Sequence, residues 1–231
     1  MKNLINSITE YSKDYLNKKN DWYNWREIKE EKLPLEIKLP QGNQYLKNRA
    51  LKNELNLKWK NTTSQDEKFE LIKYYIATWG GIHTNGKESM TEYTTLSAPE
   101  LIGKGVKGIA SWSKAIVIHN PNEYAIFDAR VAISLNCIQK IYNLDSKTLF
   151  PILSSRNKVV AKGNRLVKNI AKNEKWTKAN EETFYNEYLN ILNQVSKNFD
   201  TDISTIEMLL FAKAEELVEK TFKTELADDI A

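Results

Sequence analysis

Apolar residues recur at helical spacing along most of this chain. Leu4, Ile5, Ile8, Tyr15 and Leu16 fall on one face, which predicts an amphipathic helix over residues 3–19. The same spacing predicts further helices over 43–58, 66–79, 146–154, 157–172, 181–198 and 203–222. We also expect a short helix after Trp22, a break over 34–42 and an irregular segment over 82–96. The pattern predicts an all-α fold.

The most informative segment is residues 97–136, which read SAPELIGKGVKGIASWSKAIVIHNPNEYAIFDARVAISLN. Ser97 and Glu100 match a capping box, which opens a short helix. A tight link rich in glycine and lysine follows, and then a second helix that carries Lys114. The turn-forming NPNEY leads into a third helix, which begins at Asp128.

Length and composition limit the architecture. The chain has 231 residues but only 5 prolines and 8 glycines, so it lacks the turns that a sandwich or barrel needs. This length suits one large domain, or two small helical lobes that share a core, with a cleft between them. We expect a single helical domain over residues 1–231, and the candidate boundaries within it lie near 86–96 and 143–147.

Few residues are suited to metal or redox chemistry. A single cysteine, Cys137, excludes an intramolecular disulfide and a four-thiolate iron–sulfur cluster, and favours a reducing compartment. His83 and His119 are too far apart in sequence for a zinc site of the usual kind. We therefore expect no metal and no cofactor. The mixed charge of the N-terminus and the absence of ~20 consecutive apolar residues predict a cytoplasmic protein without membrane contact, and we expect a monomer.

The charge distribution is more informative than the net charge of +4. The range 156–175 holds seven basic residues and one acid, Glu174, whereas acids predominate after Glu207. Such asymmetry is typical of a protein with one face toward a polyphosphate. A solvated helix surface explains the same segment equally well.

Lys114 and Asp128 are the residues best suited to catalysis. Breaking the bond between a base and its deoxyribose builds positive charge on the sugar, which a fixed carboxylate stabilises. A helix N-terminus favours the charged form of a carboxylate, and Asp128 is placed for this. A lysine amine in an apolar setting attacks the sugar and displaces the base as a Schiff base forms. The structural alternative is that Asp128 only caps its helix and Lys114 is an exposed surface residue.

The motif GIASWSKAIVIHNP…YAIFDARVA resembles the helix-hairpin-helix DNA glycosylases, in particular the branch with an 8-oxoguanine DNA glycosylase-like fold. The resemblance covers residues 97–136 by motif and the rest by helical character alone. It implies a base-excising enzyme that acts on flipped nucleotides in double-stranded DNA. Lys114 matches the catalytic lysine of that family, and Asp128 matches its catalytic aspartate.

The resemblance also implies where DNA is bound. Residues 103–113 match the hairpin whose backbone amides hold a phosphate. The expected DNA-binding residues are Gly103, Lys104, Gly105, Lys107, Gly108, Ser111, Trp112 and Arg130. An everted base needs aromatic or apolar walls, for which the candidates are Trp79, His83 and Tyr93, in addition to Trp112.

The sequence departs from the family pattern at two points. Ala110 and Trp112 replace the glycines immediately before the lysine, and only 14 positions separate Lys114 from Asp128. If Lys114 does not act, the enzyme is monofunctional and Asp128 guides a water molecule. Two other classes remain open: a helix-hairpin-helix protein that binds DNA without chemistry, and a helical interaction protein in which Asp128 is only a cap. DNA repair and defence against modified foreign DNA are both compatible with excision.

Overall fold

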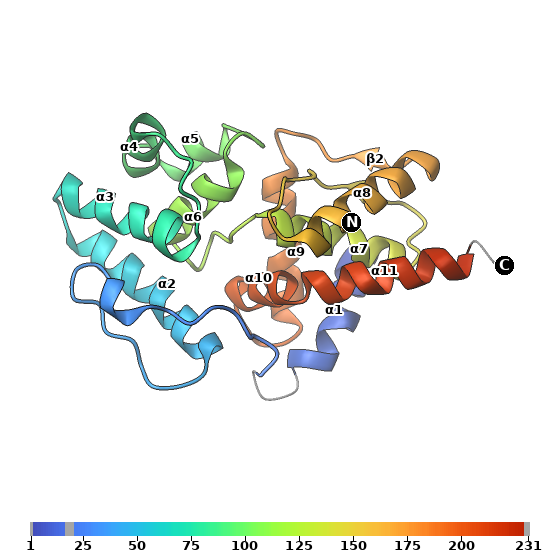
Figure 1. Ribbon diagram of the computed structural model, residues 1–231, viewed down its shortest axis with the longest axis horizontal. Helices are drawn as coiled ribbons and strands as arrows, with labels where there is room; N and C mark the ends of the chain where they lie inside the picture. The colour runs from blue at the N-terminus through green and yellow to red at the C-terminus, as the bar shows by residue number, and fades with distance from the viewer. Residues whose placement is uncertain (1, 17–20, 229–231) are drawn as a thin grey trace. The chain divides into compact units, whose positions relative to one another are not determined.

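The computed structural model describes residues 2–16 and 21–228 and is all-α (Figure 1). Eleven α-helices and one pair of two-residue strands are found in this part of the chain. The predicted all-α class is therefore confirmed. No described helix combines the length and the apolar character needed to cross a bilayer.

Contacts divide the chain into two compact units. Unit 1 consists of residues 1–22 and 127–231, and unit 2 consists of residues 23–126. The divisions therefore fall beside Trp22 and Phe127, and the boundaries expected near 86–96 and 143–147 are wrong. The grouping of both units into one domain over residues 1–231 stays a prediction.

Unit 2 is built around helix α6, which is buried from Ser111 to Ile118. Its neighbours are α2, α3, α4, α5 and the π-helix η2. The elements of unit 2 are η1 (Glu30–Lys32), α2 (Gln44–Asn61), α3 (Gln65–Lys73), η2 (Tyr74–Trp79), α4 (Lys87–Thr95), α5 (Ala98–Ile102) and α6 (Ile109–His119).

Unit 1 is built around helix α7, which is buried from Arg130 to Lys140 and contacts α1, α8, α10 and α11. The elements of unit 1 are α1 (Lys2–Leu16), α7 (Ala129–Ile141), β1 (Thr148–Leu149), α8 (Lys158–Asn173), β2 (Thr177–Lys178), α9 (Phe184–Lys197), α10 (Ile203–Ala212) and α11 (Ala214–Asp228). Both central helices come from the segment that the sequence singles out, residues 97–136.

The helix predicted over 146–154 is wrong, because two amide side chains of α7 hold this segment extended. Gln139 accepts from the backbone N–H of Thr148 at 2.7 Å and donates to its carbonyl at 2.8 Å. Asn136 makes the same pair of bonds with Phe150. The segment then pairs in parallel with β2, with Thr148 opposite Thr177. Local apolar periodicity contains no sign of these distant partners.

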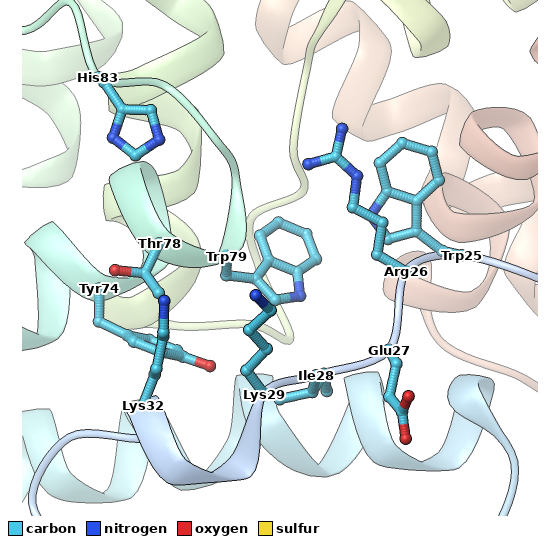
Figure 2. Close-up of a pocket in the computed structure, with 10 residues that line it drawn as sticks. All are labelled: Trp25, Arg26, Glu27, Ile28, Lys29, Lys32, Tyr74, Thr78, Trp79 and His83. Atoms are coloured by element: carbon cyan, nitrogen blue, oxygen red, sulfur yellow. The ribbon is translucent and has the colours of Figure 1, made fainter.

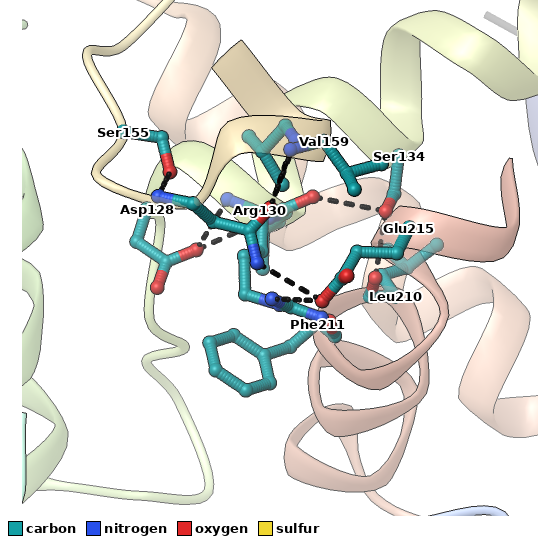
Figure 3. Close-up of polar contacts among 11 residues, drawn as sticks. Asp128, Arg130, Ser134, Ser155, Val159, Leu210, Phe211 and Glu215 are labelled. Atoms are coloured by element: carbon teal, nitrogen blue, oxygen red, sulfur yellow. Dashed lines mark hydrogen bonds and ion pairs between the residues drawn. The ribbon is translucent and has the colours of Figure 1, made fainter. Parts of the chain in front are cut away.

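The long helix predicted over 203–222 is divided at Lys213 into α10 and α11. The last carbonyls of a helix lack intrahelical partners, and two side chains of α7 supply them here. Arg130 Nε donates to the carbonyl of Phe211 at 2.9 Å, and Ser134 Oγ donates to that of Leu210 at 2.6 Å (Figure 3). A cation at a helix C-terminus also suits the helix dipole.

Two predictions in unit 2 also fail. The segment 82–96 was expected to be irregular but contains α4, which buries Met90, Tyr93 and Thr94. The segment after Trp22 was expected to be helical but has no regular structure from residue 23 to 29. Its side chains line a pocket that is described below. The helix predicted over 66–79 is α-helical only to Lys73 and continues as the π-helix η2. The other predicted helices are confirmed within a few residues, as are the caps at Ser97 and Asp202. The end of the first helix, at residues 17–19, lies outside the described residues.

The lowered pKa of Glu216 makes the stability of unit 1 depend on pH in the acid range. Its carboxylate accepts hydrogen bonds from Tyr15 at 2.5 Å, Lys220 at 2.8 Å and Lys213 at 3.1 Å. Burial alone would raise the pKa of Glu216, but these partners outweigh burial and lower the pKa to about 2. The unfolded chain takes up this proton near pH 4.3, as an ordinary glutamate does, whereas the folded chain resists it.

We expect the free energy of unfolding to fall as the pH drops from about 5 toward 2, because the unfolded state then binds more protons than the folded state. Glu216→Gln removes this contribution and gives a shallower decline over the same interval. Glu219→Gln changes an exposed carboxylate of the same helix and is the matched control. Urea unfolding at a series of pH values measures the three slopes, and equal slopes would contradict the assignment.

Candidate functional site

The segment 97–119 forms two helices joined by a tight turn. Helix α5 ends at Ile102, and α6 begins at Ile109. Between them Gly105 has φ +59° and Gly108 has φ +72°, a backbone region that favours glycine. No described group accepts a hydrogen bond from the backbone N–H groups of residues 106–108. Successive free amides in a turn of this kind form an anion-binding concavity.

Two buried aromatic side chains, Trp112 and Tyr93, pack against the turn. Trp112 is fully buried, and its Nε1 donates to the carbonyl of Gly105 at 3.1 Å. Tyr93 is also buried, and a Cβ at Gly108 would lie 2.7 Å from its hydroxyl oxygen. Neither ring lies at the surface, so the expected contacts of Trp112 and Tyr93 with DNA or with an everted base are not supported. Trp112 shares the core face of α6 with Ile109 and Ile116, at spacings that already indicate a core residue.

The lysines of the turn have different surroundings. The amine of Lys104 is 2.6 Å from a carboxylate oxygen of Glu92 on α4. Lys107 is exposed and pairs with no carboxylate of the described residues. Ser111, also expected to bind DNA, is buried and accepts a hydrogen bond from Asn85 at 2.9 Å. The surface of the turn is thus formed by Lys107 and the three glycines, with Lys104 partly exposed beside them.

Lys114 is buried in unit 2, with only 3% of its surface exposed. Its amine donates to the carbonyl of Ala110 at 2.7 Å. The side chain passes close to Gly80, where a Cβ would lie 2.9 Å from Lys114 Cε. Ala115 and Ile116, which follow it in α6, are fully buried as well, and the apolar setting expected for the Lys114 amine stays a prediction.

Asp128 begins helix α7 in unit 1. One oxygen, Oδ1, accepts from the backbone N–H groups of Arg130 at 2.9 Å and Val131 at 3.1 Å (Figure 3). The predicted cap is confirmed. The other oxygen, Oδ2, accepts no hydrogen bond from the described residues, and the side chain is half-buried. Residues 125–127, which precede it, are almost fully buried, so the carboxylate is held in a fixed position at the end of an apolar segment.

Arg130 is not the exposed residue that a DNA contact requires. It is 9% exposed and caps α10 through Phe211. Its guanidinium also lies 2.8 Å from a carboxylate oxygen of Glu215 and stacks over the Phe211 ring (Figure 3). The expected role of Arg130 at a phosphate or a base is therefore replaced by a structural one.

Trp79 and His83 both line a pocket of unit 2, whereas Tyr93 does not, and the expected role of the first two at an everted base stays a prediction (Figure 2). The pocket has a volume of about 570 Å³. Its other lining residues are Trp25, Arg26, Glu27, Ile28, Lys29, Lys32, Tyr74 and Thr78. Sequence reasoning missed these, although the cluster of aromatic and basic residues over 22–32 was a usable signal.

Helix α8 carries the basic segment of unit 1. Five cations lie along its exposed side at spacings of three and four residues, and the helix contains no acid. These residues are Lys158, Lys162, Arg165, Lys168 and Lys172. None of them pairs with a carboxylate of the described residues. The opposite side of α8 packs on α7 and α11, so the cations form a stripe on the surface of unit 1.

We expect Gly108→Ala to lower the free energy of unfolding by about 2 kcal/mol, because an L residue is strained at positive φ and its Cβ approaches the Tyr93 hydroxyl. Gly86→Ala is the control, since a Cβ there meets open space. Adding Tyr93→Phe to Gly108→Ala should restore part of the loss. Urea unfolding measures all four proteins, and equal stability of the two alanine variants would contradict the account of the turn.

Comparison of the chain with protein-family models, with curated proteins and with solved structures finds no match. Within residues 2–16 and 21–228, no group of three or more His, Cys, Asp or Glu side chains is arranged to hold a metal ion. The chemical possibilities therefore depend on Asp128, Lys114, the α5–α6 turn and the pocket of unit 2.

Proposed function

We propose that this protein is a DNA glycosylase, which cleaves the bond between a damaged or modified base and its deoxyribose after base flipping. The observation that carries the proposal is the Asp128 carboxylate, which is held by its helix through one oxygen and keeps the other available. A carboxylate that is already oriented stabilises positive charge on the sugar without further reorganisation.

A covalent variant of this reaction uses the amine of Lys114, and it requires a DNA-bound state in which that side chain, only 3% exposed in the structure, becomes accessible. In it the amine attacks C1′ of the sugar, and the base leaves with the electrons of the broken bond. Loss of a proton from the nitrogen and opening of the sugar ring then give a Schiff base. The hydrogen bond to the carbonyl of Ala110 orients the amine. Without this step, Asp128 orients a water molecule and the enzyme is monofunctional.

Two surfaces support double-stranded DNA as the partner. The α5–α6 turn offers free backbone amides beside the exposed Lys107, an arrangement that suits a phosphate. The basic stripe of α8 offers further cations for the DNA backbone. Such contacts position the duplex without reading its sequence, so they leave the identity of the excised base open.

We expect Asp128→Asn to abolish base excision while folding and DNA binding are retained. Asparagine caps a helix as well as aspartate does, so the substitution removes the charge and leaves the cap. Asp202→Asn is a matched control, because Asp202 also caps a helix of the same unit, α10, by accepting from the backbone N–H and the hydroxyl of Thr205. The assay measures abasic sites formed in duplexes that each contain one modified base, including 8-oxoguanine and modified cytosines.

The result distinguishes the proposed enzyme from its alternatives. Salt-dependent DNA binding with no abasic sites from any duplex would favour a non-catalytic helix-hairpin-helix protein. Excision by Asp128→Asn at the rate of Asp202→Asn would remove Asp128 from the mechanism. Absence of DNA binding at low salt would leave Asp128 as a cap only.

We expect borohydride to trap a covalent complex between the wild-type protein and DNA, and Lys114→Gln to abolish it, because only a primary amine forms the reducible Schiff base. Glutamine still has a side-chain N–H to donate to Ala110. Lys107→Gln is the control and should weaken DNA binding while a trapped complex still forms. Denaturing gel electrophoresis measures the complex. If Lys114→Gln formed as much trapped complex as the wild type, Lys114 would not be the nucleophile.

A further inference from the structure

The pocket of unit 2 is built by two segments that are distant in sequence. One is the stretch 25–32, which runs without regular structure into η1. The other is the π-helix η2, which supplies Tyr74, Thr78 and Trp79 (Figure 2). A π-helix is rare and is found frequently at functional sites. His83 follows four residues after η2 and completes the lining.

Trp79 is a fixed aromatic wall of this pocket. Its Nε1 donates to Asn48 Oδ1 at 2.8 Å, and its ring stacks on Tyr75 at 4.5 Å. Asn48 and Tyr75 are almost fully buried, so both contacts anchor the indole to the core of unit 2. The indole is nevertheless partly exposed and lines the cavity. It is therefore oriented before any ligand arrives.

The pocket is lined by three cations and one carboxylate, Glu27, and the carboxylate of Glu31 also lies close by, because burial and then Glu31 raise the pKa of the lining residue Tyr74 to about 12. Arg26, Lys29 and Lys32 are exposed lining residues, and none pairs with a carboxylate of the described residues. The Arg26 guanidinium lies 5.2 Å from the centre of the Trp25 ring. In Figure 2 Lys29 extends toward Trp79, Lys32 lies beside Thr78 and Arg26 beside Trp25, whereas the carboxylate of Glu27 points the other way.

Aromatic faces beside unpaired cations are the chemistry that recognises a nucleotide. A base stacks on an indole whatever its sequence identity, and arginine and lysine hold the phosphate. The volume of about 570 Å³ is ordinary for a small-molecule site. We propose that this pocket binds one 5′-phosphorylated nucleotide unit, with its base on Trp79 and its phosphate at Arg26, Lys29 and Lys32.

Two kinds of ligand carry such a 5′-phosphorylated nucleotide unit. One is a free mononucleotide, and the other is an unpaired nucleotide at the 5′ end of a single strand. This site does not depend on base excision, because it uses neither Asp128 nor Lys114. Its success or failure is measured by binding alone and is therefore distinguishable from that of the proposed glycosylase.

Binding to the full-length protein is measured by calorimetry with adenosine monophosphate and adenosine, and by anisotropy with 3′-labelled oligothymidylate with and without a 5′-phosphate. We expect at least one phosphorylated probe to bind about tenfold more tightly than its unphosphorylated counterpart. Binding of the mononucleotide alone identifies the free source, and binding of the strand alone identifies the unpaired 5′ end. Competition between the two probes shows that both enter one pocket.

The triple variant R26Q/K29Q/K32Q should lose this preference for phosphate and weaken binding about tenfold. All three side chains are exposed, so the fold tolerates the change. The control K38Q/K60Q/K87Q removes the same charge from exposed lysines of unit 2 outside the pocket and should bind as the wild type does. Trp79→Phe keeps an aromatic face and should bind better than Trp79→Leu.

Three results would overturn the proposal. The first is equal binding by the two triple variants. The second is equal binding of phosphorylated and unphosphorylated probes, and the third is no binding of any probe at millimolar concentration. Thermal unfolding of each variant checks that a loss of binding is not a loss of fold.

Discussion

The structure depends on the burial of two helices that are consecutive in the sequence, α6 and α7, each of which forms the centre of one unit. Burial of a helix requires that its polar ends and its polar side chains find partners inside the protein. Each of these requirements is met by a specific residue. The N-terminus of α7 requires Asp128, and the entry to α6 requires the left-handed glycines of the turn. Lys114 on the buried face of α6 must direct its amine to the carbonyl of Ala110.

This constraint explains why the same residues serve the fold and the proposed chemistry. Asp128 stabilises α7 through one oxygen, and the second oxygen accepts no hydrogen bond from the described residues. Lys114, which the proposed covalent step uses as a nucleophile, is buried in unit 2 with its amine on the carbonyl of Ala110. Arg130 lies two residues after Asp128, yet it is fully engaged in capping α10 and pairing with Glu215. Proximity to a catalytic candidate in the sequence is therefore no guide to function.

The sequence was a good guide where local periodicity decides the structure. The helices α1, α2, α6, α7, α8 and α9 follow from apolar spacing, and the caps at Ser97, Asp128 and Asp202 follow from residue type. It failed where a distant partner decides. The amides of Gln139 and Asn136 make residues 148–150 extended, and the capping of Leu210 and Phe211 accompanies the division of α10 from α11.

The candidate site follows the same rule. The turn, Lys114 and Asp128 were found because they lie in one continuous segment. Most of the pocket was missed because the residues 25–32 approach η2 only in the folded chain. Trp112 was misjudged for a different reason: its place beside the turn outweighed its helical spacing with Ile109 and Ile116, which marks it as a core residue.

The most direct test of the central claim is a crystal structure of the protein bound to duplex DNA that carries a non-cleavable 2′-fluorinated nucleotide. The account predicts an everted nucleotide whose C1′ atom lies about 3.5 Å from Asp128 Oδ2, close enough for the carboxylate to act on the sugar. A complex in which Asp128 faces no sugar, or in which the duplex contacts the protein without everting a nucleotide, would contradict it.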